Sequence, residues 1–444
     1  MAEQMKQETA GKAIPAGYKQ TEVGVIPQDW NVSMLRDISS KITDGTHDTP
    51  KPVIEGIPFL TAIHVKDGKI DFDGCYFLPE SIHNEIYRRC NPEFGDILMV
   101  NIGSGTATTA VVNVDYEFSL KNVALIKPNK ENNGFYINYA LSFSKNKIID
   151  TILTGGAQPF LSLTQIALLQ VPVPSREEQT TIANVLSDTD ALIDALEQLI
   201  AKKQAIKTAT MQQLLTGRTR LPQFALRPDG TPKGYKTSEL GKIPEDWEVL
   251  RIAELGQVDP ENLGSSTVPD YEFDYVSLEQ VSKGTLIGTT KMTFRNAPSR
   301  ARRVLKRGDV LVSTVRPNLM SHYFVNTEVK DLICSTGFSV VRPCEGDLCP
   351  SYLYQHLFSV VINNQIEMLI SGSNYPAINS TDVRQLKIQI GSFEEQTAIA
   401  TILSDMDSEL NALAQKLAKA RDMKQGMMQQ LLTGRIRLPL PQEA

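Results

Sequence analysis

The sequence predicts an α+β fold built by tandem duplication, in which each copy places an α+β domain before one long helix. Two observations lead to this prediction. Long phrases recur at a fixed interval of 217 residues, and each copy ends in a stretch whose apolar residues have helical spacing. "MQQLLTGRTRLP" begins at Met211, and "MQQLLTGRIRLP" begins at Met428. Two such halves usually pack with pseudo-twofold symmetry, so we expect the two helices to pair as an antiparallel coiled coil.

The duplication covers almost the whole chain of 444 residues. "GYKQTEVGVIPQDW" from Gly17 returns as "GYKTSELGKIPEDW" from Gly234, and 28 of 48 positions are identical between residues 175–222 and 392–439. This repeat is far longer than the roughly 20–50 residues of solenoid repeats. The sequence therefore predicts two complete domains.

Each copy begins with an opening and a middle, which we predict as domains over residues 15–171 and 234–388. The openings hold the only tryptophans of the chain, Trp30 and Trp247, at equivalent positions, which favours two matching core anchors. The sequences of the two middles differ, but both keep a Gly-Asp turn followed by a predicted strand, within 94–105 and 307–318. Helical stretches follow in both. We therefore expect one fold with different loops in the two copies.

The last part of each copy is predicted as a helical spacer, within residues 172–218 and 389–435. Apolar residues alternate in steps of three and four, as in a coiled-coil seam, and about 40 residues give a rod of roughly 60 Å. One amphipathic helix packed on its own domain is the alternative reading. Residues 219–233, rich in Pro and Gly, are predicted as a linker. The seam residues are Ile182, Leu186, Thr189, Ile193, Leu196 and Ile200, and then Ile399, Leu403, Met406, Leu410, Leu413 and Leu417.

The composition is that of an ordinary globular chain, with 41% hydrophobic and 22% charged residues and a net charge of −6. No apolar run approaches the length that spans a membrane, so we expect a cytoplasmic protein without membrane contact. The five cysteines have neither metal-site nor disulfide spacing, which indicates reduced thiols.

Catalytic motifs are largely missing from the sequence. "NPEF" at residues 91–94 resembles the methyl-transfer loop of adenine methyltransferases, but Glu93 replaces a proline and no S-adenosylmethionine motif accompanies it. There is no phosphate-binding GxxxxGK[ST] loop, and the five histidines lack metal-ligand spacing. We therefore expect a non-enzymatic protein that holds no metal. A self-sufficient methyltransferase is an alternative that rests on "NPEF" alone.

The repeated phrases resemble the specificity (S) subunit of type I restriction–modification systems. The resemblance rests on the "IPxDW" opening, the "EEQxxIAxxLSxxD" start of each long helix and the "MQQLLTGRxRLP" exit, and it covers nearly the whole chain twice. It implies two target recognition domains that each read half of a bipartite DNA sequence, and helices that separate these domains and dock two modification subunits.

The resemblance also implies the partners and where cofactors reside. The partners would be double-stranded DNA, two modification (M) subunits and, through their complex, restriction (R) subunits. S-adenosylmethionine, and ATP with Mg²⁺, would bind those partner subunits, and this chain would hold no cofactor. A coiled-coil adaptor that binds proteins but no DNA is the alternative function.

Neither predicted domain is basic overall: residues 15–171 hold 13 Lys and Arg against 17 Asp and Glu, and residues 234–388 hold 16 against 18. DNA binding would therefore rest on local patches. The densest basic run has two readings, phosphate binding or a solvated face. It consists of Arg295, Arg300, Arg302, Arg303, Lys306 and Arg307, with Arg88 and Arg89 at the matching place in the first copy.

Base readout is expected from the loop that follows the Gly-Asp strand, because Arg pairs with guanine and Asn with adenine in the major groove. The same residue types are common in turns, which is the alternative for each. The candidates are Asn101, Ser104 and Thr106 in the first copy, Arg316 and Asn318 in the second, and Gln158, Asn374 and Tyr375 in two later loops.

Overall fold

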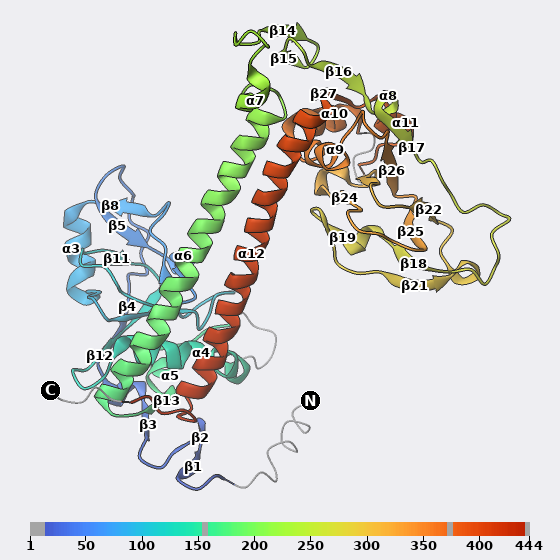
Figure 1. Ribbon diagram of the computed structural model, residues 1–444. Coiled ribbons are helices and arrows are strands. Elements are labelled where there is room, and N and C mark those ends of the chain that lie inside the picture. Colours follow the sequence, from blue (N-terminus) through green and yellow to red (C-terminus); the bar gives the residue numbers. More distant parts are fainter. Residues whose placement is uncertain (1–13, 153–158, 371–375, 440–444) are drawn as a thin grey trace. The chain divides into compact units, whose positions relative to one another are not determined.

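The computed structural model describes residues 14–152, 159–370 and 376–439. The chain divides into two compact units, Met1–Leu196 with Lys416–Ala444, and Glu197–Gln415. Each unit therefore contains one α+β domain together with a segment of both long helices (Figure 1). The units do not follow the repeat boundaries, because the end of the second copy belongs to the first unit.

The opening of each copy forms a hairpin and then a strand that pairs with the last strand of its domain. In the first unit β3 pairs with β13, and in the second β16 pairs with β27. The tryptophan before each of these strands is buried, with Trp30 1% and Trp247 0% exposed, which confirms the predicted core anchors. The first-unit elements are β1 (Tyr18–Thr21), β2 (Gly24–Pro27), β3 (Asn31–Met34), α2 (Leu35–Ile38) and β13 (Gln170–Val173).

The first domain is built on a four-stranded sheet with the strand order β10-β9-β12-β4. Ile97 and Met99 of β9 lie in one hydrophobic core, and Leu98 and Val100 lie in another. Successive side chains of a strand point to opposite faces, which explains why all four residues of β9 are apolar and buried. The remaining elements are β4 (Ser39–Asp44), β5 (Ile57–Leu60), η1 (Ala62–His64), β6 (Val65–Lys66), β7 (Lys69–Ile70), β8 (Tyr76–Leu78), α3 (Glu80–Arg89), β9 (Ile97–Val100), β10 (Thr109–Val111), β11 (Ser119–Leu120), β12 (Val123–Pro128), α4 (Gly134–Ile152) and α5 (Leu163–Ala167).

The second domain repeats this plan with the sheet β17-β26-β23-β24, in which β23 takes the place of β9. Val310 and Val312 of β23 face one core and Leu311 faces another. Its elements are β14 (Tyr235–Ser238), β15 (Gly241–Pro244), β16 (Glu248–Arg251), α8 (Ile252–Leu255), β17 (Gly256–Val258), β18 (Glu272–Val276), η2 (Leu278–Gln280), β19 (Val281–Ser282), β20 (Thr285–Leu286), β21 (Thr290–Thr293), η3 (Phe294–Asn296), β22 (Ala301–Leu305), β23 (Val310–Ser313), η4 (Pro317–Leu319), β24 (Tyr323–Phe324), β25 (Leu332–Ser335), β26 (Phe338–Pro343), α9 (Pro350–His356), α10 (Val360–Leu369), α11 (Ser380–Gln385) and β27 (Lys387–Ile390).

The two long helices are α6 (Arg176–Leu214) and α12 (Phe393–Leu431), each of 39 residues. In the first unit Asp190 of α6 pairs with Lys424 of α12 at 2.6 Å, and in the second Lys203 pairs with Glu409 at 2.8 Å. The partner's number falls as the number along α6 rises, so the helices are antiparallel. The predicted pairing is confirmed, and the alternative of helices packed only on their own domains is wrong.

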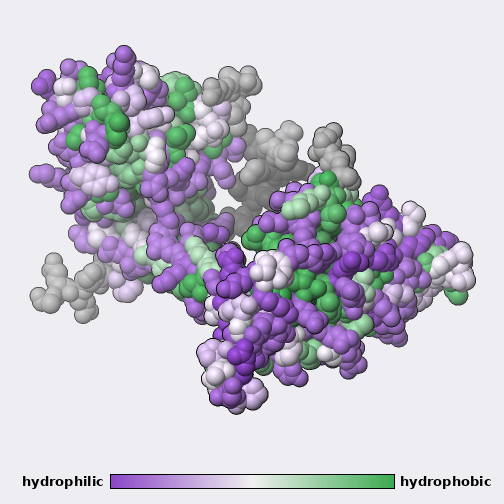
Figure 2. All heavy atoms as spheres, turned by 90° about the horizontal axis from the view of Figure 1, so that it is seen from above, coloured by the Kyte–Doolittle hydropathy of each residue, from purple (hydrophilic) through white to green (hydrophobic). Residues whose placement is uncertain are grey.

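The linker contains a short helix, α7 (Pro222–Ala225), and belongs to the second unit. The face drawn in Figure 2 is mostly hydrophilic, with apolar residues in separate patches. Within the described ranges, no helix is long and apolar enough to cross a membrane. All five cysteines are free thiols.

Candidate nucleic-acid interface

Several loops of the first domain emerge at one end of its four-stranded sheet. β9 ends at Val100, which lies opposite Val123 at the start of β12, and Asp44 at the end of β4 lies opposite Ala124. The loops that follow β4 and β9, and the turn before β12, are therefore neighbours. We call this the loop end of the sheet, and the corresponding end of the second domain's sheet lies where β23 finishes.

The first candidate loop is held against the segment at 159–161. Ile102 forms a β-bridge with Phe160, and the amide of Gly103 donates to the carbonyl of Pro159 at 3.1 Å. The hydroxyl of Thr106 donates to the carbonyl of Gly103 at 2.7 Å and lies 3.0 Å from the carbonyl of Pro159. The structure thus brings together two loops that the sequence analysis singled out separately.

The second domain has the same arrangement at its loop end. Val315, two residues after β23, forms a β-bridge with Ala377, and the amide of Arg316 donates to the carbonyl of Pro376 at 2.8 Å. Arg316 and Met320 have left-handed backbones, with φ of 50° and 52°, on either side of the single turn η4. Such backbones are uncommon outside glycine and are often found at functional sites.

The predicted base-reading residues differ in accessibility. Ser104, Arg316 and Asn318 are exposed, whereas Asn101 and Thr106 are only 6% and 2% exposed. Thr106 closes the loop through its hydroxyl, which fits the turn-residue alternative. Asn101 keeps a buried side-chain oxygen without a hydrogen-bond partner in the described part of the chain. The candidates Gln158, Asn374 and Tyr375 lie outside the described residues.

The basic run of the second domain is largely neutralised by acidic neighbours. Four of its six cations are ion-paired at 2.7–3.1 Å: Arg295 with Asp270, Arg303 with Asp259, Lys306 with Glu261 and Arg307 with Glu328. Arg300 is exposed, and Arg302 stacks 4.8 Å from the ring centre of Phe294. No ion pair of these two arginines occurs among the described residues. The run is therefore a mixed surface in which nearby acids offset the charge of four of the six cations.

In the first domain, the two arginines that end α3 have different surroundings. Arg89 forms an ion pair with Asp44 at the loop end, and Asp44 also accepts a contact of 3.0 Å from His47. Arg88 is exposed. The first domain therefore has two basic residues where the second has six, as the sequence indicated.

The "NPEF" segment has a structural role. The side-chain amide of Asn91 donates to Glu93 at 2.9 Å, and Lys127 donates to the carbonyl of Asn91 at 2.9 Å and to Glu93 at 3.1 Å. These contacts account for the polar groups of the segment without a substrate. They weaken the only sequence feature that favoured a methyltransferase.

An arginine that follows each long helix binds acidic residues of the other copy, a contact that the sequence analysis did not predict. Arg437 donates to both oxygens of Asp29, at 3.0 and 2.9 Å, and to Glu178 at 2.8 Å. Glu178 is 3% exposed and also accepts the indole N–H of Trp30 at 3.1 Å. We call these four residues the Arg437 cluster.

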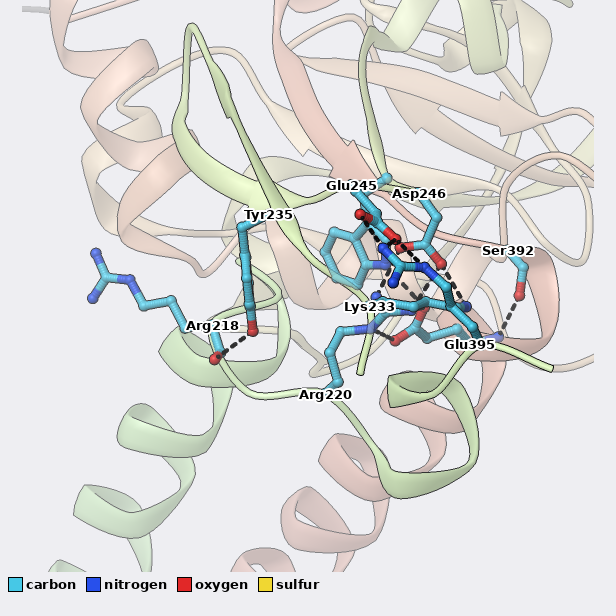
Figure 3. Close-up of polar contacts among 10 residues, drawn as sticks. Arg218, Arg220, Lys233, Tyr235, Glu245, Asp246, Ser392 and Glu395 are labelled. Atoms are coloured by element: carbon cyan, nitrogen blue, oxygen red, sulfur yellow. Dashed lines mark hydrogen bonds and ion pairs between the residues drawn. The ribbon is translucent and has the colours of Figure 1, made fainter. Parts of the chain in front are cut away.

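The second unit contains the equivalent Arg220 cluster. Arg220 donates to Glu395 at 2.6 and 2.7 Å and to Asp246 at 2.8 and 3.2 Å, and Trp247 donates to Glu395 at 2.9 Å. Figure 3 shows Arg220, Asp246 and Glu395 converging, while the side chain of Arg218 points away. The motif "MQQLLTGRxRLP" that ends each copy therefore binds the opening segment of the other copy.

The charges of the Arg220 cluster depend on one another. Burial alone would raise the pKa of Asp246, but hydrogen bonds from Arg220 and Lys233 lower it to about 2. In the first unit, the hydrogen bond from Arg437 lowers the pKa of Asp29. Both carboxylates are therefore charged at neutral pH. The Arg and Asp residues of the clusters recur 217 apart, which marks them as shared features of the repeat but does not show that they meet across the two copies.

The glycine in the motif after each long helix is required where this motif packs against the opening of the other copy. Gly217 and Gly434 have φ of 67° and 64°. A Cβ atom would lie 2.4 Å from the ring of Pro244 in one case and from that of Pro27 in the other. Only glycine fits a left-handed helix end pressed against a proline ring. The repetition of "TGRxRLP" thus follows from two equivalent junctions.

Two matching α+β domains on a pair of antiparallel helices define a duplicated scaffold protein with a candidate binding surface on each domain. The model of the type I restriction modification DNA specificity domain matches residues 27–208 and again residues 244–420. The chain belongs to this family, that of the specificity (S) subunits of type I restriction–modification systems.

Relatives extend the likeness over nearly the full length. A Methanocaldococcus jannaschii protein, named as a candidate type I restriction enzyme MjaX specificity subunit, is 28% identical over 435 residues, which cover 95% of this chain and 97% of the relative. The MjaVIII specificity subunit of the same organism is 25% identical over 432 residues, covering 93% and 94%. The crystal structure of the S subunit from M. genitalium matches the fold with a TM-score of 0.59 at 14% identity, covering 94% of this chain and 97% of that one.

Proposed function

We propose that this chain is the DNA-specificity subunit of a type I restriction–modification complex and that each domain reads one half of a bipartite, asymmetric target. The main support is the loop end. Both domains build it from equivalent strands and the same loop pairing, yet Ser104 is exposed in one domain and Arg316 and Asn318 in the other. A shared frame with different exposed groups suits two unlike half-sites.

Phosphate contacts would provide affinity without sequence information. Arg300 and Arg302 of the second domain and Arg88 of the first are the cations of the candidate set best placed for this role, because most of the others already neutralise acids. The net charge of −6 then requires that partner subunits supply part of the phosphate-binding surface.

The chain would direct chemistry that its partners perform. Adenine methylation would use S-adenosylmethionine on the modification subunits, and restriction subunits, joined through their complex, would use ATP with Mg²⁺. A protein that acts on DNA in this way would work in the cytoplasm. The structural role of Asn91 supports a non-catalytic subunit.

The helices carry matching surfaces for two copies of one partner. Asp188, Ala195 and Lys202 of α6 are exposed at seven-residue spacing, and the equivalent positions of α12 hold the same residues, also exposed: Asp405, Ala412 and Lys419. Beside this row, α6 also exposes three apolar residues with the same spacing, and 38–51% of each is accessible: Leu192, Leu199 and Ile206. This second row is not part of the matching surface, because α12 holds Glu409, Lys416 and Met423 at the equivalent positions. Rows with heptad spacing outside the α6–α12 seam are suited to further helices.

A steric test addresses the docking of modification subunits. Ala195→Trp should block one subunit, and Ala195→Trp with Ala412→Trp should block both, because a large ring in the row prevents close helix packing. Light scattering of the purified complexes would show one and then no bound modification subunit. Serine at the same two positions is the matched control and should leave two subunits bound. Two bound subunits in the double tryptophan variant would exclude this surface.

DNA binding distinguishes the proposal from a coiled-coil adaptor. A gel-shift assay with random-sequence competitor, with and without modification subunits, should show a sequence-specific complex. Binding of proteins alone, with no specific DNA complex in any combination, would favour the adaptor. Transfer of labelled methyl groups by the purified chain alone would show a self-sufficient methyltransferase and overturn the proposal.

A further inference from the structure

An exposed apolar pair lies at the loop end of the first domain. Ile102 is 44% exposed and Phe160 is 51% exposed, and the two residues face each other across their β-bridge. Neither belongs to a hydrophobic core of the described residues. Folding therefore does not explain why an isoleucine and a phenylalanine occupy these two positions.

Hydrogen bonds and core packing hold the backbone around this pair. The amide of Leu161 donates to the carbonyl of Asn101 at 2.8 Å, and Leu161 itself is 1% exposed and packed in the core. Thr106 and Gly103 tie the loop to the carbonyl of Pro159. A surface that is already fixed loses little conformational entropy when it binds.

This part of the loop end offers few polar groups to a ligand. The segments 101–106 and 159–161 hold no charged residue, Asn101 is buried and the hydroxyl of Thr106 is engaged within the loop. The second domain differs at the equivalent place, where smaller residues form the bridge and Arg316 and Asn318 are exposed. The first domain therefore presents a large apolar pair near the exposed Ser104, whereas the second presents Arg316 and Asn318 beside a single exposed Leu319.

We propose that Ile102 and Phe160 bind the 5-methyl group of a thymine in the first half-site. That methyl group is the one apolar group on base edges in the major groove. The inference rests on the proposed function and adds that the first domain identifies an A·T pair through its methyl group. A wedge between base pairs would need a fully protruding side chain, whereas half of Phe160 is covered by its own chain.

The test removes the methyl group alone. The target is first defined by methylation mapping of the complex of this chain with its modification subunits. Each thymine is then replaced in turn by deoxyuridine, which lacks only the 5-methyl group. One replacement in the first half-site should weaken binding of this complex about fourfold, the value expected for one buried methyl group.

Variants show whether the effect belongs to this pair. In Phe160→Ala, thymine and deoxyuridine at that position should bind equally, and Ile102→Ala should reduce the difference. The control is Phe94→Ala, since Phe94 is 65% exposed but precedes β9 at its other end, and here the fourfold difference should remain.

Three outcomes would overturn the inference and leave the proposed function intact. They are a first half-site without any A·T pair, specific binding that no deoxyuridine alters, and a sharp DNA bend that disappears in Phe160→Ala, which would indicate a wedge. Absence of any sequence-specific DNA binding by the complex without substitutions would instead contradict the proposed function itself.

Discussion

At the residue scale, Arg220 and Arg437 have the clearest structural roles, because each neutralises a buried glutamate and an aspartate of the other copy. Glu395 and Glu178 are 1% and 3% exposed and accept from tryptophan as well as arginine. A buried carboxylate without its arginine is strongly unfavourable. The two clusters should therefore determine the stability of the two units separately.

Arg220→Met should destabilise the second unit by about 3–5 kcal/mol, because it leaves Glu395 buried without its cation. In a Trp30→Phe background, Trp247 is the only tryptophan and its fluorescence reports unfolding of this unit. Arg218→Met is the matched control, since this neighbouring arginine is exposed and points away (Figure 3). Equal melting of the two variants would show that the cluster does not stabilise the unit.

The same cluster predicts a pH dependence. The pKa of Asp246 is lowered from 3.8 to about 2 in the folded chain, so its contribution to stability is complete above about pH 4 and is lost as the pH falls towards 2. Melting at pH 5, 4 and 3 should show a steeper loss in Arg218→Met than in Arg220→Met, which lacks the pairing. Parallel pH curves for the two variants would contradict this assignment.

The basic run predicts a difference between paired and unpaired cations. Arg300→Ala with Arg302→Ala should weaken binding to all DNA sequences and lower the salt slope by about two units, one for each phosphate contact. Lys306→Ala should change the slope little, because Lys306 already pairs with Glu261 at 2.7 Å. The dependence of DNA affinity on salt concentration measures both. Similar salt slopes for the natural chain, the double arginine variant and Lys306→Ala would mean that Arg300 and Arg302 form a solvated face.

At the element scale, the sequence predicted what depends on local patterns. The four apolar residues of β9 follow a Gly-Asp turn, and the apolar seams of α6 and α12 repeat over 39 residues, so both were visible without a structure. Contacts between positions far apart in the chain could not be predicted from the sequence. Arg437 meets Asp29 across 408 residues, and no local pattern indicates that the exit of one copy binds the opening of the other.

The candidate interface shows the same limit. The sequence pointed to both loops of each domain, but not to the bridge between Ile102 and Phe160, which joins positions far apart in the chain. It also could not show that Thr106 is buried or that four cations of the basic run face acids, because burial and ion pairing depend on the folded chain.

We expect the length of the paired helices to set the gap between the two half-sites of the DNA target. Seven residues inserted after Lys202 and seven after Lys419 add about 10.5 Å of helix while the seam stays in register. The gap between half-sites should grow by up to about three base pairs at 3.4 Å each. Methylome sequencing of cells that express the variant with its modification subunit would show the new spacing. A stable, active variant that methylates at the original spacing would show that the helices do not set it.

At the scale of the whole molecule, the chain holds two domains, and we expect each of them to recognise DNA without the other. Each domain has its own cores and its own loop end, and the identical segments lie in the openings and helices. Changes within one domain should therefore leave the other domain's recognition intact. The boundaries 39 and 171 enclose the divergent middle of the first copy and leave the Arg437 cluster untouched.

Exchange of residues 39–171 for the corresponding segment of another specificity subunit tests this claim most directly. The methylome of cells that express the hybrid with the modification subunit gives the target sequence. One half-site should change, while the other half-site should stay the same. A folded, active hybrid in which both half-sites change, or neither does, would show that the two domains do not recognise their half-sites separately.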